Sequence, residues 1–169
     1  IYQKENSTTC LTAIESLQNM GWEISESSIK KGLANTIKNT SLLGRWQLIS
    51  TSPDTICDIG HNEDGIKQIC RQLKNINYEH LHFVYGTVND KSLDGILALL
   101  PQDAKYYFCK PNIARGLDEI ELQKKAKKKG LTGEAYSSVK RAFSTATEKA
   151  TNNDLIFIGG STFVVAEAL

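Results

Sequence analysis

The sequence lacks the features that mark membrane proteins, basic nucleic-acid-binding proteins and secreted proteins. No apolar run approaches the ~18–20 residues that a membrane-spanning helix needs, and the amino terminus does not resemble a secretory signal. Lys and Arg number 20 against 19 Asp and Glu, so the net charge of +1 gives no field that would attract nucleic acid or an anionic membrane surface. We therefore expect neither nucleic acid nor membrane among the partners.

Cysteine is also scarce, at 4 of 169 residues, and the four are far apart. They are Cys10, Cys57, Cys70 and Cys109. No Cys-x-x-Cys pair is present to begin a zinc site, and a secreted disulfide framework is usually denser. His80 and His82 share a strand-like segment, but no third metal ligand accompanies them. We predict reduced thiols, a cytoplasmic location and no metal site in this chain.

The motifs of complete catalytic centres are missing as well. The chain contains no Walker A loop, GxSxG elbow, HExxH pair or GxGxxG fingerprint. It starts without Met and enters periodic sequence directly, which favours a piece of a longer protein. The sequence therefore predicts part of a site rather than a whole one.

A polar stretch divides the chain into two parts. Apolar residues recur at helical spacing over residues 5–20, and a second helix is predicted to begin at the N-cap Ser25. Residues 35–43, rich in Asn and Thr, are expected to form a linker. A domain boundary at about residue 40 then separates a helical segment, 1–40, from a larger domain, 41–169.

In the larger domain, strand-like runs alternate with helical segments. The strands are predicted at Trp46–Ser50, Thr55–Asp58, Leu81–Gly86, Tyr106–Cys109 and Leu155–Ile158. The helices are predicted at 62–76, 92–100, 118–129 and 139–150, with a short final helix after Ser161. This alternation predicts an α/β fold with three αβα layers, a Rossmann-like, mostly parallel sheet and right-handed crossovers. Acids at the start of the 118–129 helix and lysines at its end complement the helix dipole, so we interpret the lysines as a solvated helix end.

A turn between a predicted strand and helix carries the most informative polar residues, Asp58-Ile59-Gly60-His61-Asn62. In open α/β sheets, ligands bind at the carboxyl ends of strands. Asp58 can accept hydrogen bonds from ribose hydroxyls, and His61 can donate to a phosphate or a carboxylate. Asn62 can cap the next helix. The alternative, in which Asp58 and Asn62 only satisfy backbone donors of the turn, is equally open.

Two further turns contain glycine beside a possible anion-binding residue. Arg45, after Gly44, can present a planar fork of donors to a phosphate, or can pair with a surface carboxylate. Gly159-Gly160-Ser161-Thr162 can hold an anionic group, or can serve strand-to-helix geometry alone.

In their order along the chain, these motifs resemble one family closely. Asp58 to Asn62 is similar to the Asp-x-x-His-Asn motif in the carboxyl-terminal domain of the folylpolyglutamate synthase/dihydrofolate synthase family, in the Mur ligase superfamily. The other similar segments are Gln3-Lys4-Glu5-Asn6, Gly44-Arg45, Gly86 to Lys91, Lys110-Pro111 through Arg115, and Gly159 to Glu167. Together they cover essentially the whole chain.

The resemblance implies a carboxyl-terminal glutamate ligase domain at 41–169 and a remnant of the central ATPase domain at 1–40. Such enzymes use ATP to phosphorylate a carboxylate, and the amine of L-glutamate attacks the acyl phosphate. The implied cofactors are ATP and Mg²⁺, with the magnesium ligands in the central domain. The implied partners are L-glutamate, folate or dihydropteroate and the upstream ATPase domain of the same chain. We expect a monomer, and no activity from these 169 residues alone.

The resemblance also implies roles for seven residues. His61 is implied to be catalytic, because it would place phosphate or the incoming glutamate. Those implied to bind ATP are Asn6, Arg45 and Asp58. Those implied to bind glutamate are Asn62, Ser161 and Lys91.

One departure and three rival functions bear on this interpretation. Glu63 stands where the family commonly has proline, which adds an acid beside a pocket expected to bind anions. The nearest rival is a Mur-type ligase that adds amino acids to peptidoglycan precursors, against which His61-Asn62 argues. The second rival is a receiver-like module with Asp58 as phosphoacceptor. Such a module needs a further acidic pair after its first strand, and this chain does not supply one. A non-catalytic nucleotide-binding module is the third.

Overall fold

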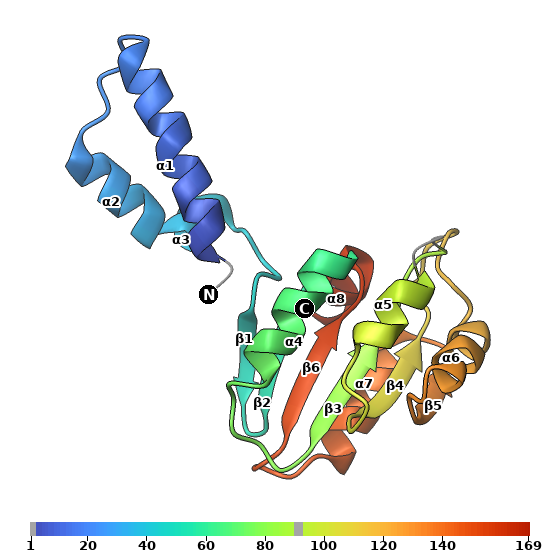
Figure 1. Cartoon of the computed structure of the whole chain (residues 1–169). Coiled ribbons are helices and arrows are strands. Elements are labelled where there is room, and N and C mark those ends of the chain that lie inside the picture. The colour runs from blue at the N-terminus through green and yellow to red at the C-terminus, as the bar shows by residue number, and fades with distance from the viewer. Residues whose placement is uncertain (1–2, 90–92) are drawn as a thin grey trace. The chain divides into compact units, whose positions relative to one another are not determined.

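The computed structural model describes residues 3–89 and 93–169. The chain forms two compact units, Ile1–Leu43 and Gly44–Leu169. Figure 1 shows helices in the first unit and a sheet flanked by helices in the second. Within the described residues, no helix has both the length and the apolar character that crossing a membrane requires.

The first unit contains three helices, α1 (Gln3–Asn19), α2 (Glu26–Ala34) and α3 (Thr36–Thr40). The predicted N-cap of α2 is confirmed, because the Ser25 hydroxyl accepts a hydrogen bond from the Ser28 N–H at 3.1 Å. The prediction of a linker at 35–43 is wrong where α3 forms. Its polar residues show no apolar period, yet the hydroxyls of Thr36 and Thr40 are satisfied by carbonyls one turn earlier. That this unit belongs to an ATPase domain stays a prediction.

The second unit is built on a six-stranded sheet. Its strands are β1 (Gln47–Thr51), β2 (Asp54–Asp58), β3 (Leu81–Tyr85), β4 (Lys105–Cys109), β5 (Gly133–Tyr136) and β6 (Leu155–Gly159). They lie in the order β1-β2-β6-β3-β4-β5. β1 runs antiparallel to β2 and the other neighbours are parallel, which confirms the predicted α/β fold with a mostly parallel sheet.

Helices cover both faces of this sheet (Figure 1). They are α4 (Glu63–Leu73), α5 (Leu93–Leu99), α6 (Glu119–Lys128), α7 (Val139–Lys149) and α8 (Thr162–Ala168). One apolar cluster joins α4, α5 and α6 to strand residues that include Phe83 and Phe157. A second joins α7 and α8 to strand residues that include Val84 and Ile158. Since successive strand residues point to opposite faces, the two clusters make the three predicted layers.

Burial on both faces explains which strands the sequence reveals. β3 and β6 are buried at every position, and their residues are apolar except for His82 of β3. β5, by contrast, is not predicted, because it is four residues long, none of them buried, and contains a glycine. That glycine is required: a side chain at Gly133 would collide with the Tyr106 backbone carbonyl.

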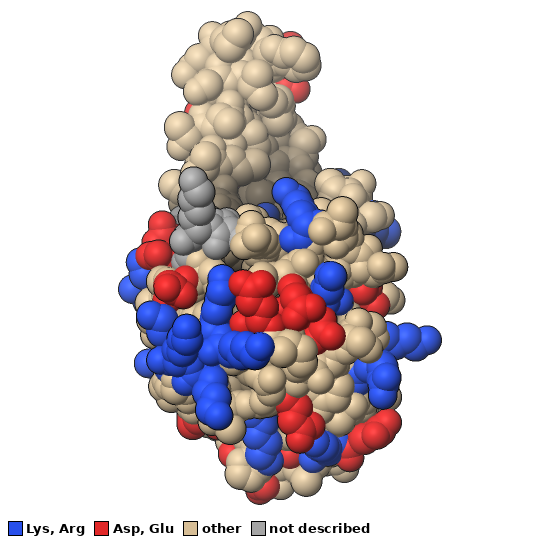
Figure 2. Space-filling model, turned by 90° about the vertical axis from the view of Figure 1, so that its right-hand side faces the viewer, with Lys and Arg blue, Asp and Glu red and all other residues tan. Residues whose placement is uncertain are grey.

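The lysine-rich helix α6 lies at the right of Figure 1 and on the side of the molecule shown in Figure 2. Figure 2 shows Lys and Arg side chains gathered on this side, with Asp and Glu side chains beside them. Asp118 caps the helix, and Lys125 pairs with Glu121 at 3.1 Å. Lys127 and Lys128 follow in the last turn. The charges thus follow the helix dipole, as the sequence predicts.

Three strands end together at one edge of the sheet, which we call the carboxyl edge. Asp58 of β2 is in register with Gly159 of β6, and Gly159 is in register with Tyr85 of β3. The loops that follow these strands therefore begin side by side. This register places the candidate site.

At the opposite, amino edge, His82 is buried among polar groups. Its side chain is 0% exposed, with Nδ1 2.8 Å from the Tyr107 hydroxyl and Nε2 3.4 Å from Asp154 Oδ2. Burial, together with the charge of nearby Lys105, lowers the pKa of His82 against the opposing effect of Asp154. The folded state therefore favours the neutral imidazole.

Asp154 ties two loops together at the same edge. Its carboxylate accepts hydrogen bonds from the N–H groups of His80 and Thr151, at 2.9 and 2.7 Å. Burial alone would raise the pKa of Asp154, but these donors hold it below its usual value. Asp154 thus closes the amino edge with two backbone hydrogen bonds, whereas the buried His82 Nε2 faces Asp154 Oδ2 at 3.4 Å and has no hydrogen-bond partner among the described residues.

We expect the free energy of unfolding to fall as the pH falls through the ordinary histidine pKa of ~6.5. Unfolded His82 binds a proton more readily than folded His82, so the slope can reach about 1.4 kcal/mol per pH unit. Denaturant unfolding between about pH 7.5 and about pH 5.5 measures this slope. His82→Gln should flatten it, and His80→Gln, at an exposed neighbour, should not. Equal slopes in the two variants would contradict the assignment.

Candidate functional site

The loops at the carboxyl edge enclose a cavity of about 240 Å³, which we call the edge cavity. It draws on the turns after β2 and β6, the loops after β3 and β4, and the start of α5. Its polar side chains are His61, Thr87, Arg115, Ser161 and Thr162. Its apolar side chains are Val88, Leu93, Ile96 and Phe163.

Asp58 ends β2 and organises the turn that follows. Its side chain is 2% exposed, with Oδ2 accepting a hydrogen bond from the Trp46 N–H and Oδ1 from the Gly60 N–H, each at 2.8 Å. The Ile59 N–H also donates to the Gly44 carbonyl at 2.9 Å. The carboxylate therefore joins the segment before β1 to the turn after β2. Of the two open interpretations, backbone satisfaction describes the observed geometry, and a ribose contact stays a prediction.

Asn62 begins α4 as its N-cap. Its Oδ1 accepts a hydrogen bond from the Gly65 N–H at 2.8 Å, which confirms the predicted cap. Glu63, the departure from the family pattern, reaches α5: a Cβ on Gly95 would collide with the Glu63 carboxylate. This acid is not part of the described lining of the edge cavity.

The turn after β6 requires glycine. Gly160 has a φ of +95°, and a side chain there would collide with the Tyr85 ring and the Gly86 carbonyl. The close approach brings Ser161 to the wall of the edge cavity, where it is 5% exposed. Ser161 Oγ also accepts a hydrogen bond from the Phe163 N–H at 3.2 Å and so caps α8.

The charge of the edge cavity favours an anion. His61 is exposed, with Nδ1 3.1 Å from the Ile59 carbonyl oxygen. Arg115 comes from the loop after β4. None of the described residues that line the cavity is acidic. Arginine, histidine and hydroxyl groups together suit a carboxylate or a phosphate.

The structure brings two of the seven predicted site residues, His61 and Ser161, into one cavity. Those that lie in the neighbouring segments without lining it are Arg45, Asp58 and Asn62. Asn6 belongs to the helical unit, and Lys91 lies outside the described residues. The ligand roles of all seven stay predictions.

Arg115 is the residue that the sequence analysis does not single out. No motif marks it, although it ends a segment that resembles the family. The available signal is topological: β4 is the parallel neighbour of β3, so the loop after β4 borders the same carboxyl edge.

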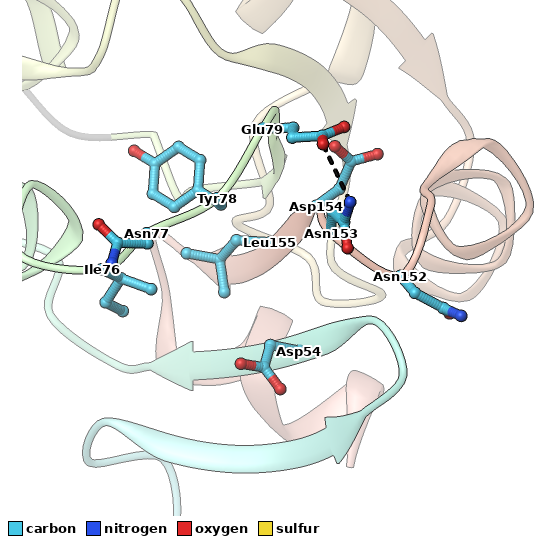
Figure 3. A pocket seen from close by; sticks show the side chains of 9 residues that line it. All are labelled: Asp54, Ile76, Asn77, Tyr78, Glu79, Asn152, Asn153, Asp154 and Leu155. Atoms are coloured by element: carbon cyan, nitrogen blue, oxygen red, sulfur yellow. Dashed lines mark hydrogen bonds between the residues drawn. The ribbon is translucent and has the colours of Figure 1, made fainter.

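A larger cavity, of about 470 Å³, lies at the amino edge (Figure 3). Its polar groups hold loops together: Asn153 Nδ2 donates to Glu79 Oε1 at 2.9 Å, and Asp154 accepts the two backbone bonds described above. Ligands of open α/β sheets bind at the carboxyl ends of the strands. We therefore place the functional site at the edge cavity.

The described residues do not fit a metal site. Within 3–89 and 93–169, no three His, Cys, Asp or Glu side chains are grouped so that they could hold an ion. The four cysteines are free. Burial, reinforced by the charge of Asp58, raises the pKa of the Cys57 thiol to about 11, which makes it a packing residue rather than a nucleophile.

Comparisons with known proteins agree with one another. The family described as "Mur ligase, glutamate ligase domain" matches residues 44–162. The "Probable bifunctional folylpolyglutamate synthase/dihydropteroate synthase" of Haloferax volcanii is 33% identical over 147 residues, which cover 86% of this chain and 17% of that protein. The dihydrofolate synthase/folylpolyglutamate synthase of Escherichia coli is 29% identical over 160 residues, which cover 94% and 36%.

A solved structure gives the same result. A bifunctional folylpolyglutamate synthase/dihydrofolate synthase with Mn, AMPPNP and L-glutamate bound matches with a TM-score of 0.78 and 26% identity. The match covers 93% of this chain and 37% of that one. The chain therefore spans little more than a third, or less, of the length of these proteins.

We expect Asp58→Asn to lower the free energy of unfolding by about 1–3 kcal/mol, because the amide NH₂ would face one of the two backbone donors that the carboxylate now satisfies. Denaturant unfolding measures the loss. Asp54→Asn, at the exposed start of β2, is the matched control and should change stability by less than about 0.5 kcal/mol. If both variants were equally stable, Asp58 would not organise the turn.

Proposed function

Since the chain belongs to the Mur ligase family and carries its glutamate ligase domain, we propose that it forms the glutamate-binding wall of a ligase that uses ATP to add L-glutamate to folates. The observation that carries this proposal is the edge cavity, in which arginine, histidine and hydroxyl groups meet without a described acid. The names of the similar proteins support folate as the acceptor. The nucleotide, Mn and L-glutamate in the matching structure support the ligands.

The proposed reaction has two steps. ATP transfers its terminal phosphoryl group to a folate carboxylate, which gives an acyl phosphate and ADP. The amine of L-glutamate then attacks the acyl carbon and phosphate leaves, so that an amide forms. The chain's proposed contribution is positioning and charge stabilisation, because the edge cavity offers arginine, histidine and hydroxyl groups.

We assign the predicted residues as follows. His61, exposed at the edge cavity, would place phosphate or the incoming glutamate, and Ser161 lies beside it. Asn62 and Lys91 are proposed as further glutamate contacts. Arg45 is exposed and suits an ATP phosphate. Asn6 is proposed to contact the ATP phosphates as well.

Asp58 is proposed to contact the nucleotide ribose, because a carboxylate at the carboxyl end of a parallel strand can accept hydrogen bonds from ribose hydroxyls. Its hydrogen bonds from the Trp46 and Gly60 N–H groups hold the carboxylate at the end of β2. The match to the Mur ligase, glutamate ligase domain over residues 44–162 disfavours the receiver-like alternative for Asp58.

The exposed side chains of the helical unit support the proposal that a second domain packs against it. None of residues 6–43 is buried, and Met20 and Trp22 are 76% and 64% exposed. So small a unit rarely buries enough surface to be stable alone. We propose that these side chains pack against the ATPase domain of the same chain, which would supply the phosphate loop and the Mg²⁺ ligands. We propose a monomer in the cytoplasm, where the four free thiols would stay reduced.

A ligation assay tests the proposal. Joined to its ATPase domain, the chain should release ADP only when L-glutamate and a folate or dihydropteroate acceptor are both present. The 169 residues alone should show no such release. Release with a muramyl acceptor in place of folate would instead establish the peptidoglycan-precursor alternative.

His61→Ala should lower the ligation rate at least about 100-fold, while the free energy of unfolding changes by less than about 0.5 kcal/mol, because the side chain is exposed. The measurements are ADP release in the joined protein and denaturant unfolding. His80→Ala, which changes an exposed histidine at the amino edge, is the control and should keep the rate. An unchanged rate in His61→Ala would remove His61 from the mechanism.

A further inference from the structure

Arg115 is a charged group in the edge cavity without a described counterion. It is exposed, and its guanidinium carbon lies 5.3 Å from the centroid of the Phe163 ring. The ion pairs of the described residues do not include it. A guanidinium stacked on a ring keeps its in-plane donors available for a planar anion.

The backbone on both sides of Arg115 is fixed to other parts of the fold. Its carbonyl accepts a hydrogen bond from the Asn89 N–H at 3.1 Å, and the Leu117 N–H donates to the Thr87 carbonyl at 2.9 Å. Gly116 forms an antiparallel bridge with Val88. The loop after β4 is therefore tied along its end to the loop after β3.

A side chain of α8 holds the start of the same loop. Glu167 Oε1 accepts a hydrogen bond from the Asn112 N–H at 2.6 Å. Because α8 also supplies Phe163, one helix positions both the loop and the ring under the arginine. A loop whose backbone is held in this way loses little backbone conformational entropy when its side chains bind a ligand.

The edge cavity suits a small amphipathic anion better than a nucleotide. Its volume of about 240 Å³ lies below the ~300–1,000 Å³ that is usual for sites of drug-sized ligands. Val88 and Phe163 can contact methylene groups, while Arg115 and His61 can meet a charged end. A bare phosphate would leave the apolar wall uncovered.

We propose that Arg115 binds a carboxylate of the incoming L-glutamate and thereby selects a dicarboxylic amino acid. This assignment rests on the proposed function. Arginine pairs with carboxylates through two parallel N–H···O bonds, which fixes orientation as well as affinity. Its positive charge also disfavours protonation of a nearby amine, and the neutral amine is the form that attacks.

Titration of the ¹⁵N-labelled 169-residue chain with L-glutamate, followed by NMR, tests this directly. The wild type should show saturable shifts in the edge cavity in the millimolar range. Arg115→Gln should weaken binding at least about tenfold, as expected for a lost charged hydrogen bond. Arg115→Lys, which keeps the charge without the fork, should fall between the two. Arg141→Gln, at an exposed arginine of α7, is the matched control and should bind within about twofold of wild type.

Two amides identify the carboxylate that Arg115 binds. L-glutamine lacks the side-chain carboxylate, and L-isoglutamine lacks the α-carboxylate. Arg115→Gln should no longer distinguish glutamate from the amide of the bound carboxylate, while it still distinguishes the other amide. An equal loss for glutamate and both amides would overturn a carboxylate contact.

Other results would overturn the proposal as well. They are the absence of saturable shifts in the wild type, binding of Arg115→Gln within about twofold of wild type, and inorganic phosphate binding at Arg115 more tightly than glutamate. Denaturant unfolding of each variant shows that a loss of binding is not a loss of fold. Failure of the ligation assay would reject the proposed function independently, whatever Arg115 binds.

Discussion

The buried carboxylate of Asp58 is the interaction on which the carboxyl edge depends. A buried charge is costly unless it is hydrogen-bonded, and here two backbone N–H groups from different segments satisfy it. One of them belongs to Trp46, whose φ of +49° is unfavourable for a residue with a side chain. The bond to Asp58 and the contact of the Trp46 ring with Phe157, at 5.9 Å between centroids, hold that conformation. Together with the hydrogen bond from the Ile59 N–H to the Gly44 carbonyl, this link fixes the start of β1 against the turn that carries His61.

The two ends of β6 show how one sheet separates stability from binding. At its amino end, Asp154 and the buried His82 are committed to loops and to neighbouring strands. At its carboxyl end, two glycines replace side chains: Gly159 lies against the Asp58 carbonyl of β2, and Gly160 lies against Tyr85 of β3. Space for a ligand therefore arises at the carboxyl edge, where the chain has its smallest residues. At the amino edge, the polar side chains instead form hydrogen bonds that hold the loops together.

The sequence predicts the layers and most elements because the central strands are apolar on both faces and each helix has a periodic apolar side. It does not predict β5 or α3, which are short, have no buried residue and are stabilised by contacts that carry no apolar pattern. At the site, the cap at Asn62 follows from local chemistry and is predictable. The proximity of Arg115 to His61 is not, because it depends on the order of β3 and β4 in the sheet and on the bonds between their loops.

These contacts divide the family-like residues into two kinds. Asp58, Asn62 and Gly160 have structural reasons to be present: a buried carboxylate, a helix cap and a positive φ beside a neighbouring carbonyl. Resemblance at those positions therefore follows from the fold as much as from a ligand. His61 and Arg115 are exposed side chains at the edge cavity, and the fold needs neither side chain to satisfy a buried group. In the function that we propose, recognition of an anionic substrate would therefore fall mainly on these two residues. Ser161 would serve both purposes, because its hydroxyl caps α8 within the cavity wall.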